Sequence, residues 1–548
     1  MSERGQVSDT GFFHVDKAGV TRRLPKPAGL IAVLWAGLLA VTLACLLLGC
    51  GKTSLLDPRK PVTLTLWHTY VEDMRYSLDE LIKEFNHTVG AQQGVVVKVT
   101  SVADARVLNE QIIAAANKDP GAHEMPDMAV IYPQVAITLA RKGALADLGQ
   151  YITPDALSSF VPEFILEGRL NSDSLYLMPI AKSAEVLYVN RTLFERFSGE
   201  TGVTTESLST FEGIKETAAR YYEWSGGKSF FYPENLFNQA MIGFQQLGDE
   251  LIHDRKLNLS TQTFARIWDC YYAPAVKGGV SVYDGWGNYL ASTGEVVCAT
   301  ASSAGSSFYP SSVTWPDNTK EDVVIDVLPY PVFAGGEKVV MQRGGGICVS
   351  KSSPAREYAA CLFLNWLTEA QRNLRFCANI GYVPVRRAAF DQIMAGNFPE
   401  IANPISAKAL LTVAAMREEY RFYVPPVFDG LDAMQSQYAG LMRAAAQSGR
   451  VTYARLLEED GAPAVVGNEH VSPGGLAAND GDAESDKDAS IAVESESVTG
   501  EHAPISVPDT PVPLGSLSNS VPHDPALAFE ALSREAMEDF IQIIGAKE

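Results

Sequence analysis

Residues 46–54, with the sequence LLLGCGKTS, carry residue types for two different chemistries. The tripeptide GKT at 51–53 matches the end of a phosphate-binding loop, whereas the residues ending at Cys50 match a site where a lipoprotein is cleaved and acylated. A phosphate-binding loop needs a glycine five positions before Gly51, and Leu46 stands there instead. The spacing therefore excludes a nucleotide site and favours lipidation of Cys50.

The residues before Cys50 support the same interpretation. Positions 28–48 are apolar, which is the length of a membrane segment rather than of a buried strand. Three basic residues between positions 22 and 26 precede this run, as in a signal peptide. We therefore predict a signal peptide at 1–49, a lipidated cysteine with a tether at 50–61, and a chain on the periplasmic side of a bacterial membrane. An uncleaved single-span anchor is the alternative.

Further candidate residues follow predicted strands, where ligands of α/β sheets bind. Tyr70 follows the first strand, and Asp104 follows the second. Asp104 has a carboxylate that could accept hydrogen bonds from the hydroxyl groups of a ligand, or cap a helix instead. Ser302 and Ser303 occupy a serine-rich loop after a later strand, where hydroxyl and N–H groups could bind ligand oxygens or simply form a polar turn.

The elements that position these residues alternate between strand and helix. Residues 62–67 alternate apolar and polar side chains, which predicts a strand, and a helical apolar face follows it. Parallel neighbours need crossover connections, so this alternation predicts a doubly wound parallel sheet. Further strands are predicted at 95–99, 128–131, 175–179, 186–189, 296–300, 323–328 and 346–349. Further helices are predicted at about 211–224, 234–247, 262–276 and 354–367.

A change of composition divides the last part of the chain. Residues 458–523 are first rich in Gly, Ala, Ser, Asp and Glu and then rich in Pro. Such a segment cannot bury enough apolar surface to offset its ordering entropy, so we expect a disordered acidic linker. Residues 524–548 become helical again, with apolar side chains that include Leu527, Phe529 and Phe540 on one face.

The bulk composition excludes several classes of protein. With 548 residues, the chain is too long for one ordinary core and is expected to form two domains or lobes. Its net charge of −21 argues against nucleic acid as a partner. Five cysteines remain after Cys50, none in a C-x-x-C pair, so we predict buried thiols, no metal site and no cofactor.

Five stretches together resemble a known family. TLTLWHTYVEDMRYSLDELIKEFN, MPDMAVIYPQVAITLARKGALADLGQYI, SLYLMPIAKSAEVLYVNRTLFE, ASTGEVVCATASSAGSSFYPSS and EYAACLFLNWLTEAQRNLRFCANIGYVPVRRAAF occur in the family's order. They are similar to extracellular solute-binding proteins of ABC importers, of the sugar and glycerol-phosphate type. The resemblance implies an α/β fold of the type II periplasmic-binding-protein kind, with two Rossmann-like lobes, a hinge and a cleft between them. Lobe I would combine 62–168 with about 301–345, and lobe II would combine 169–300 with about 346–457.

The resemblance also implies ligand-binding positions. It places such contacts at Lys182, Ser183, Tyr232, Gly345 and Tyr382. An aromatic ring such as Tyr232 suits the C–H face of a sugar. Trp286 is a further aromatic candidate and Arg386 a further polar one; ordinary packing and a structural salt bridge are their alternatives.

These observations predict a function without catalysis. The chain is expected to be a monomeric lipoprotein that captures a small solute, a sugar or an oligosaccharide, and delivers it to membrane permease subunits. Glycerol-phosphate binders carry a basic phosphate ligand where this chain has Tyr438, which disfavours a phosphate here. A glycerol phosphate or glycerophosphodiester is therefore only the alternative to a neutral sugar. A secreted glycosidase and a surface adhesin on the same fold are the other candidates, although no nucleophile motif or metal-ligand cluster is present in the sequence.

Overall fold

The computed structural model describes residues 55–70, 72–379, 381–459 and 525–546. The chain forms two units, Met1–Leu55 and Leu56–Glu548, and the described residues other than Leu55 belong to the second. Outside the described residues lie the predicted signal peptide, Cys50 and residues 460–523 of the predicted linker. Among the residues that are described, no helix has both the length and the hydropathy that a membrane span requires.

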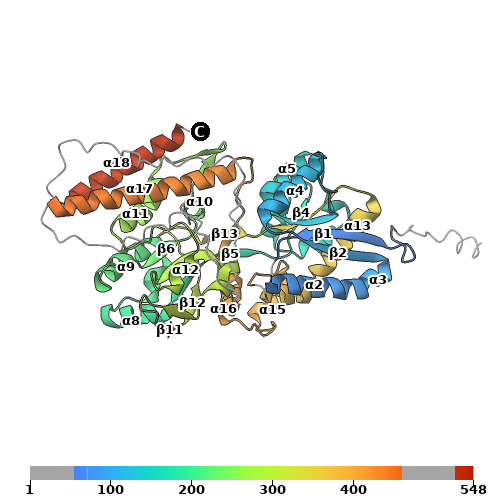
Figure 1. Cartoon of the computed structure of the whole chain (residues 1–548), viewed down its shortest axis with the longest axis horizontal. Helices are drawn as coiled ribbons and strands as arrows, with labels where there is room; N and C mark the ends of the chain where they lie inside the picture. Colours follow the sequence, from blue (N-terminus) through green and yellow to red (C-terminus); the bar gives the residue numbers. More distant parts are fainter. Residues whose placement is uncertain (1–54, 71, 380, 460–524, 547–548) are drawn as a thin grey trace, which may run out of the picture. The chain divides into compact units, whose positions relative to one another are not determined.

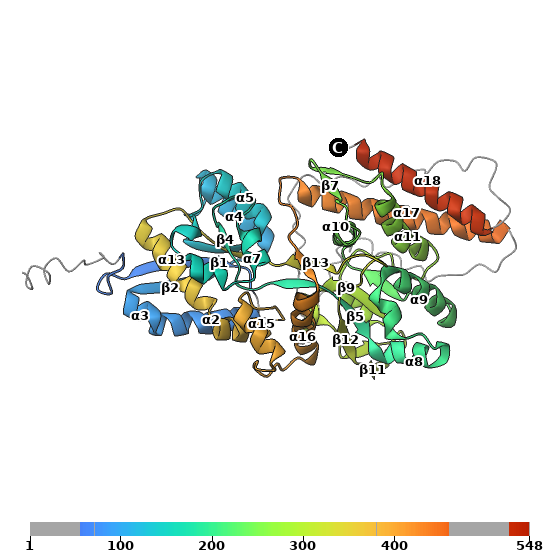
Figure 2. The same ribbon diagram turned by 180° about the vertical axis from the view of Figure 1, so that it is seen from behind.

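The first sheet has the strand order β2-β1-β3-β14-β4. β1 is parallel to both β2 and β3, as the alternation of strands and helices predicts. β14 runs antiparallel to β3 and β4, so the sheet is mixed rather than wholly parallel. Its strands are β1 (Val62–His68), β2 (Val95–Ser101), β3 (Met128–Ile131), β4 (Leu177–Met178) and β14 (Gly346–Val349). The helices near these strands are α2 (Glu72–His87), α3 (Val89–Gln93), α4 (Ala105–Asn117), α5 (Pro133–Arg141), α7 (Pro162–Gly168) and α13 (Pro354–Leu367); Figure 1 labels all of them except α7, which Figure 2 labels.

The second sheet has the order β15-β13-β5-β9-β6, and β12 also pairs with β5. All eight residues of β5 are buried, and neighbouring strands pair with it on both sides. Most pairings are antiparallel; β6 with β9 and β13 with β15 are parallel. The strands are β5 (Ser183–Asn190), β6 (Phe231–Pro233), β9 (Cys298–Ser302), β12 (Ile325–Leu328), β13 (Val339–Arg343) and β15 (Arg421–Tyr423).

The strand pairing corrects the expected assignment of the two returning segments. The family resemblance implies that about 301–345 belong to the first lobe and about 346–457 to the second. In the structure β12 and β13 belong to the second sheet, and β14 belongs to the first. The chain crosses at Gly344 and Gly345, between β13 and β14, so the assignment was wrong for these strands. An apolar strand pattern shows that a strand is buried but not which sheet it joins.

The C-terminal helix α18 (Pro525–Gly545) lies beside α17 (Leu431–Glu459), as Figures 1 and 2 show from opposite sides. The predicted helix is therefore confirmed. Phe529 and Phe540 are buried, and the Phe540 ring stacks on that of Phe264 with ring centroids 5.6 Å apart. Leu527 was expected on the same face but is 50% exposed, because it lies in the first turn of α18, at the edge of the contact.

Other short elements and helices complete the described part. The 3-10 helices are η1 (Leu148–Gln150), η2 (Thr205–Ser209) and η3 (Ser303–Phe308), and the hairpin strands are β7 (Ile252–His253), β8 (Lys256–Leu257), β10 (Ser312–Thr314) and β11 (Lys320–Asp322). The helices are α6 (Pro154–Ser158), α8 (Arg191–Thr201), α9 (Phe211–Trp224), α10 (Leu236–Gln246), α11 (Gln262–Val276), α12 (Gly287–Ser292), α14 (Ala370–Asn379), α15 (Arg387–Met394) and α16 (Pro404–Glu419). The five cysteines after Cys50 are free and buried, which confirms the prediction.

Candidate functional site

A charged cluster lies where β13 ends against the start of β5. The Arg343 guanidinium is 3.2 Å from a carboxylate oxygen of Glu185, and Asn238 of α10 donates to the same oxygen at 2.8 Å. The Glu185 side chain is 3% exposed and that of Arg343 is 32% exposed. A buried carboxylate needs such partners, because an unpaired charge away from water is costly. Because about a third of the Arg343 side chain is exposed, this guanidinium remains available to a ligand.

Glu234 adds a second carboxyl group to this cluster. It follows β6, is partly exposed, and accepts a hydrogen bond from the Gly287 amide at 2.9 Å. Burial raises the pKa of Glu234 to about 7, against the lowering effects of the Gly287 amide and of Arg343, while Glu185 adds to the rise. Burial lowers the pKa of Arg343, but the nearby Glu185 and Glu234 charges raise it more, so this pKa lies above its usual value. Glu234 can therefore change its charge near neutral pH.

The predicted serines lie together beside this cluster. The Ser302 hydroxyl donates to the Ser183 hydroxyl at 3.1 Å, and Ser302 pairs with Glu185 in the register of β9 and β5. Ser303 is buried and accepts a hydrogen bond from the Ala184 amide at 3.3 Å. Ser302 is partly exposed, so it is the serine of this group best placed to contact a ligand.

Three predicted aromatic residues surround the cluster in different ways. Tyr382 is partly exposed and lies close enough to Arg343 to raise its pKa. Trp286 is partly exposed and directly precedes Gly287, whose amide binds Glu234. Tyr232 is buried, and its hydroxyl donates to the Gly285 carbonyl at 2.6 Å, while burial raises its pKa. Tyr382 and Trp286 therefore remain candidates for stacking, whereas the contacts of Tyr232 favour a structural role.

Four further predicted residues have structural contacts. Asp104 caps α4 by accepting from the Val107 amide at 2.8 Å, which is the alternative that the sequence left open. Lys182 is fully buried, forms an ion pair with Glu167 and donates to the Gly344 carbonyl at 2.6 Å. Gly345 lies so near β3 that a Cβ atom there would be 2.5 Å from the Ile131 carbonyl oxygen. Arg386 donates to the Thr368 carbonyl and lies over the Phe160 ring.

Tyr70 follows the first strand, as expected. It is partly exposed, and its ring centroid lies 5.4 Å from that of His68 and 6.3 Å from that of Phe376. The Tyr70 amide donates to Nδ1 of His68 at 3.0 Å. The ring is therefore held by aromatic neighbours in the region of the first sheet.

Sequence reasoning missed Glu185, Asn238, Glu234 and Arg343. A signal was present for each acid: Glu185 interrupts the apolar strand SAEVLYVN, and Glu234 comes directly after a buried strand. A charged residue in an apolar strand needs a partner, and Arg343 directly precedes three consecutive glycines at 344–346. Their pairing could not be predicted, because they are separated by up to 158 positions in the sequence.

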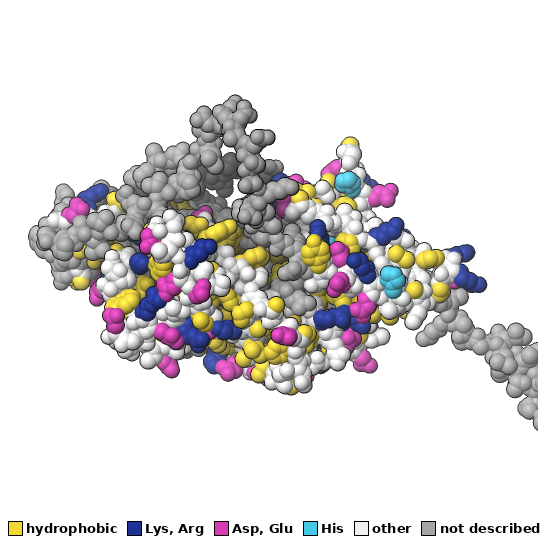
Figure 3. Space-filling model, turned by 60° about the horizontal axis from the view of Figure 1, so that its bottom comes forward, with side chains coloured by type: hydrophobic (Ala, Val, Ile, Leu, Met, Phe, Trp, Pro, Cys, Tyr) yellow, Lys and Arg dark blue, Asp and Glu magenta, His cyan; other side chains and the backbone are white. Residues whose placement is uncertain are grey.

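On the face drawn in Figure 3, Lys and Arg side chains lie among Asp and Glu side chains rather than in one basic patch. No cluster of three or more His, Cys, Asp or Glu side chains suited to a metal occurs within the described ranges. The carboxyl, guanidinium and hydroxyl groups of the cluster around Arg343 can form hydrogen bonds with a ligand.

The described chain thus has two mixed β-sheets with helices beside them, joined by segments that carry polar groups at the crossing. The sequence profile described as bacterial extracellular solute-binding protein matches residues 80–403, more than half of the chain. The chain therefore belongs to the bacterial extracellular solute-binding proteins, which face the outside of the cell. No curated protein sequence matches it.

Solved structures share the fold at low sequence identity. The cyclic α-maltosyl-1,6-maltose binding protein of Arthrobacter globiformis has a TM-score of 0.55 and 18% identity, over 71% of this chain and 93% of its own. UgpB of Mycobacterium tuberculosis, in complex with glycerophosphocholine, has a TM-score of 0.55 and 15% identity, over 73% and 97%. An Agrobacterium radiobacter solute-binding protein in complex with ribitol has a TM-score of 0.53 and 18% identity, over 72% and 96%. These similarities establish the type II binding-protein fold predicted from the sequence.

Proposed function

We propose that this protein binds an uncharged sugar or polyol at the cluster of Arg343, Glu185 and Glu234, and delivers it to an ABC permease. The main support for this proposal is that the partly exposed Arg343 guanidinium, the partly exposed Glu234 carboxyl group and the Ser302 hydroxyl lie in one cluster. Vicinal hydroxyls donate to carboxylates and accept from guanidinium groups, so a polyol satisfies both. Trp286 and Tyr382 offer ring faces for the apolar side of such a ligand.

The charge balance disfavours a phosphate ligand. Glu185 already neutralises Arg343, and Glu234 adds a further acidic group. A phosphodiester would meet one shared positive charge beside two carboxyl groups, which is poor electrostatic complementarity. Glycerophosphocholine, the ligand of one structural neighbour, is therefore our second candidate and belongs in the same binding panel.

A binding role also fits this acid pair better than hydrolysis does. Glycosidases need two carboxyl groups that both reach the scissile bond. Glu185 is 3% exposed and engaged by Arg343 and Asn238, so it cannot approach a substrate. Incubation with oligosaccharides followed by chromatography should therefore return the sugars unchanged.

Closure would depend on the segments that join the sheets. We propose one lobe around each sheet and a hinge at the start of β5 and at the turn between β13 and β14. Gly344 in this turn has a φ of +97°, which favours glycine, and Lys182 donates to its carbonyl. A ligand that contacts groups from both lobes would favour the closed form, which the permease then recognises.

Lipidation of Cys50 would anchor the protein to the outside of the membrane. The proposal rests on the apolar run, the basic flank and the Gly49–Cys50 junction. Two or more acyl chains hold a protein far better than one. Mass spectrometry of the mature N-terminal peptide tests it: a diacylglyceryl cysteine supports the proposal, and an intact residue 1–49 segment contradicts it.

Intrinsic tryptophan fluorescence with a solute panel tests the binding function. Maltose, maltotriose, trehalose, ribitol and glycerophosphocholine are suitable members. We expect a saturable response to a neutral sugar or polyol, lost in Arg343→Gln and retained in Glu110→Gln. Glu110 is a suitable control because it pairs with Arg106 on the exposed face of α4. A response to glycerophosphocholine alone would favour the second candidate.

A further inference from the structure

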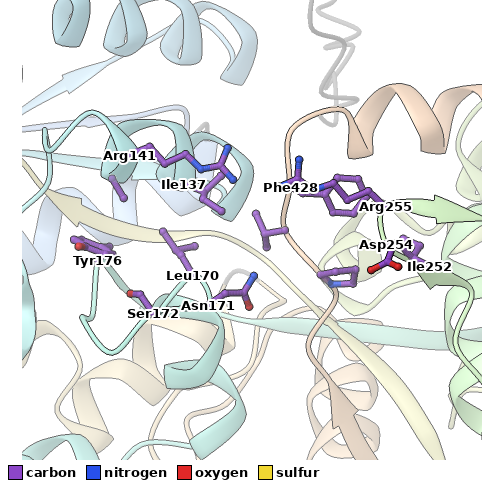
Figure 4. A pocket seen from close by; sticks show the side chains of 13 residues that line it. Ile137, Arg141, Leu170, Asn171, Ser172, Tyr176, Ile252, Asp254, Arg255 and Phe428 are labelled. Atoms are coloured by element: carbon purple, nitrogen blue, oxygen red, sulfur yellow. The ribbon is translucent and has the colours of Figure 1, made fainter. Parts of the chain in front are cut away.

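A cavity of about 590 Å³ lies apart from the cluster around Arg343. None of its lining residues is among those of the cluster or among the residues predicted from the sequence. In Figure 4, Ile137 and Arg141 of α5 lie on one side, and Phe428 and Arg255 lie on the other. This volume lies within the range of small-molecule sites, which is about 300–1,000 Å³.

Backbone conformation marks two turns at this cavity. Among the described residues, six other than glycine have a positive φ, and four of them line the cavity. They form two consecutive pairs: Leu170 (51°) with Asn171 (61°), and Asp254 (49°) with Arg255 (63°). Glycine is preferred in this conformation, and two-residue hairpin turns favour Asn-Gly. Retaining side chains at strained positions is a feature of functional sites.

The Asp254–Arg255 turn presents an available cation. The turn joins β7 and β8, and within the described ranges Arg255 forms no ion pair. Its guanidinium lies 6.0 Å from the centroid of the Phe428 ring. The Asp254 side chain is 94% exposed, so water screens its charge. Arg141, in contrast, is already paired with Asp429.

These features together fit a flat anion. Phe428 and the guanidinium plane of Arg255 offer a stacking surface, and Ile137 and Leu170 add apolar walls. Arg255 supplies donors that match a carboxylate in a bidentate arrangement. We propose that this cavity is a second binding site, which takes a small aromatic carboxylate.

The elements that line the site suggest what it does. α5 and the residues after α7 belong to the region of the first sheet, whereas the β7–β8 hairpin precedes α11 in the region of the second. A relative motion of these regions changes the shape of the cavity. An aromatic carboxylate bound there therefore alters solute affinity, and the solute alters carboxylate affinity by the same factor. This coupling rests on the proposed solute-binding function; the existence of the second site does not.

Fluorescence titration with 2-naphthoate tests the site directly. The full chain should bind naphthoate saturably. Its affinity for 2-naphthalenemethanol, the uncharged counterpart, should be lower by at least about tenfold. Arg255→Gln should lose about tenfold in naphthoate affinity. The double variant Asp254→Asn/Arg255→Gly should melt at a temperature higher by about 2 °C or more, because it relieves the turn, and should lose naphthoate binding.

Lys118→Gly is the matched control. Lys118 also has a positive φ, of 60°, but it ends α4 and does not line the cavity. This variant should keep naphthoate binding unchanged. Equal naphthoate affinity in the wild type and in both Arg255 variants would overturn the proposal, as would the absence of saturable binding.

Three results would separate this site from the solute site. Arg343→Gln should lose the response to sugar while binding naphthoate as the wild type does. Naphthoate binding without any sugar response would refute the proposed function and leave the second site standing. Sugar binding without naphthoate binding would refute the second site and leave the proposed function standing. If both bind and neither changes the affinity of the other, the proposed coupling is wrong.

Discussion

Replacing Glu234 with Gln should change how the stability of the protein depends on pH. Burial raises the pKa of Glu234 from 4.5 to about 7, so the folded chain holds this proton more tightly than the unfolded chain does. The resulting stabilisation is complete below pH 4.5 and is lost as the pH rises through 7. The variant lacks this effect, because a glutamine side chain does not titrate.

The size of the effect follows from the two pKa values. At about 1.4 kcal/mol per pH unit, the difference between 4.5 and about 7 corresponds to at most about 3.5 kcal/mol. Glu234 is partly exposed, so screening by water reduces the effect, and we expect about 1–3 kcal/mol. Relative to the wild type, Glu234→Gln should therefore gain this amount of unfolding free energy between pH 5 and pH 8.

Urea unfolding of both proteins at several pH values is the assay. Comparing the two proteins cancels the titration of other groups, and Glu110→Gln should show no such trend. A difference in unfolding free energy that stays constant from pH 5 to pH 8 would refute the reasoning about Glu234. If the solute donates a hydrogen bond to the Glu234 carboxylate, the wild-type affinity for the solute should increase as the pH is raised towards 7, by up to about tenfold per pH unit. Above pH 7 the affinity should stay constant.

Three other predictions concern stability and anchoring. Arg343→Met should lower the unfolding free energy by about 2–4 kcal/mol, because it leaves the buried Glu185 carboxylate without its cation. The double variant Arg343→Met/Glu185→Met should regain most of this free energy, as measured by urea unfolding. Phe540→Ala should cost about 3–5 kcal/mol and Leu527→Ala less than about 0.5 kcal/mol, because the first side chain is 3% exposed and the second 50%. Equal costs would contradict the proposed packing of α18. Cys50→Ala should move the protein from the membrane fraction to the soluble fraction, as judged by immunoblotting of fractionated cells; unchanged membrane association would contradict lipidation.

Local patterns predicted individual elements well. The apolar run at 128–131 coincides with β3, and the predicted helices at 211–224, 262–276 and 354–367 coincide with α9, α11 and α13. These segments have clear periodicity and good boundary residues: Thr210, Thr261 and Ser353 each cap the following helix through the side chain. Local side-chain chemistry therefore determined where these helices begin.

Long-range pairing could not be predicted in the same way. The apolar patterns of β13 and β14 are both those of buried strands, yet the two strands enter different sheets. The Glu185–Arg343 contact depends on the register of β5 and β13, which hydrophobic periodicity does not reveal. Lys182 shows the converse problem, because the family resemblance implied a ligand contact there, whereas the side chain is buried and paired with Glu167.

A crystal structure of the protein with the solute selected by the fluorescence panel would show whether Arg343 and Glu234 bind that solute. The account predicts a neutral sugar or polyol with oxygen atoms within about 3.2 Å of both Arg343 and Glu234. The ring of Trp286 or Tyr382 should lie against the apolar side of that solute. A solute bound without contact to Arg343 or Glu234 would contradict the account.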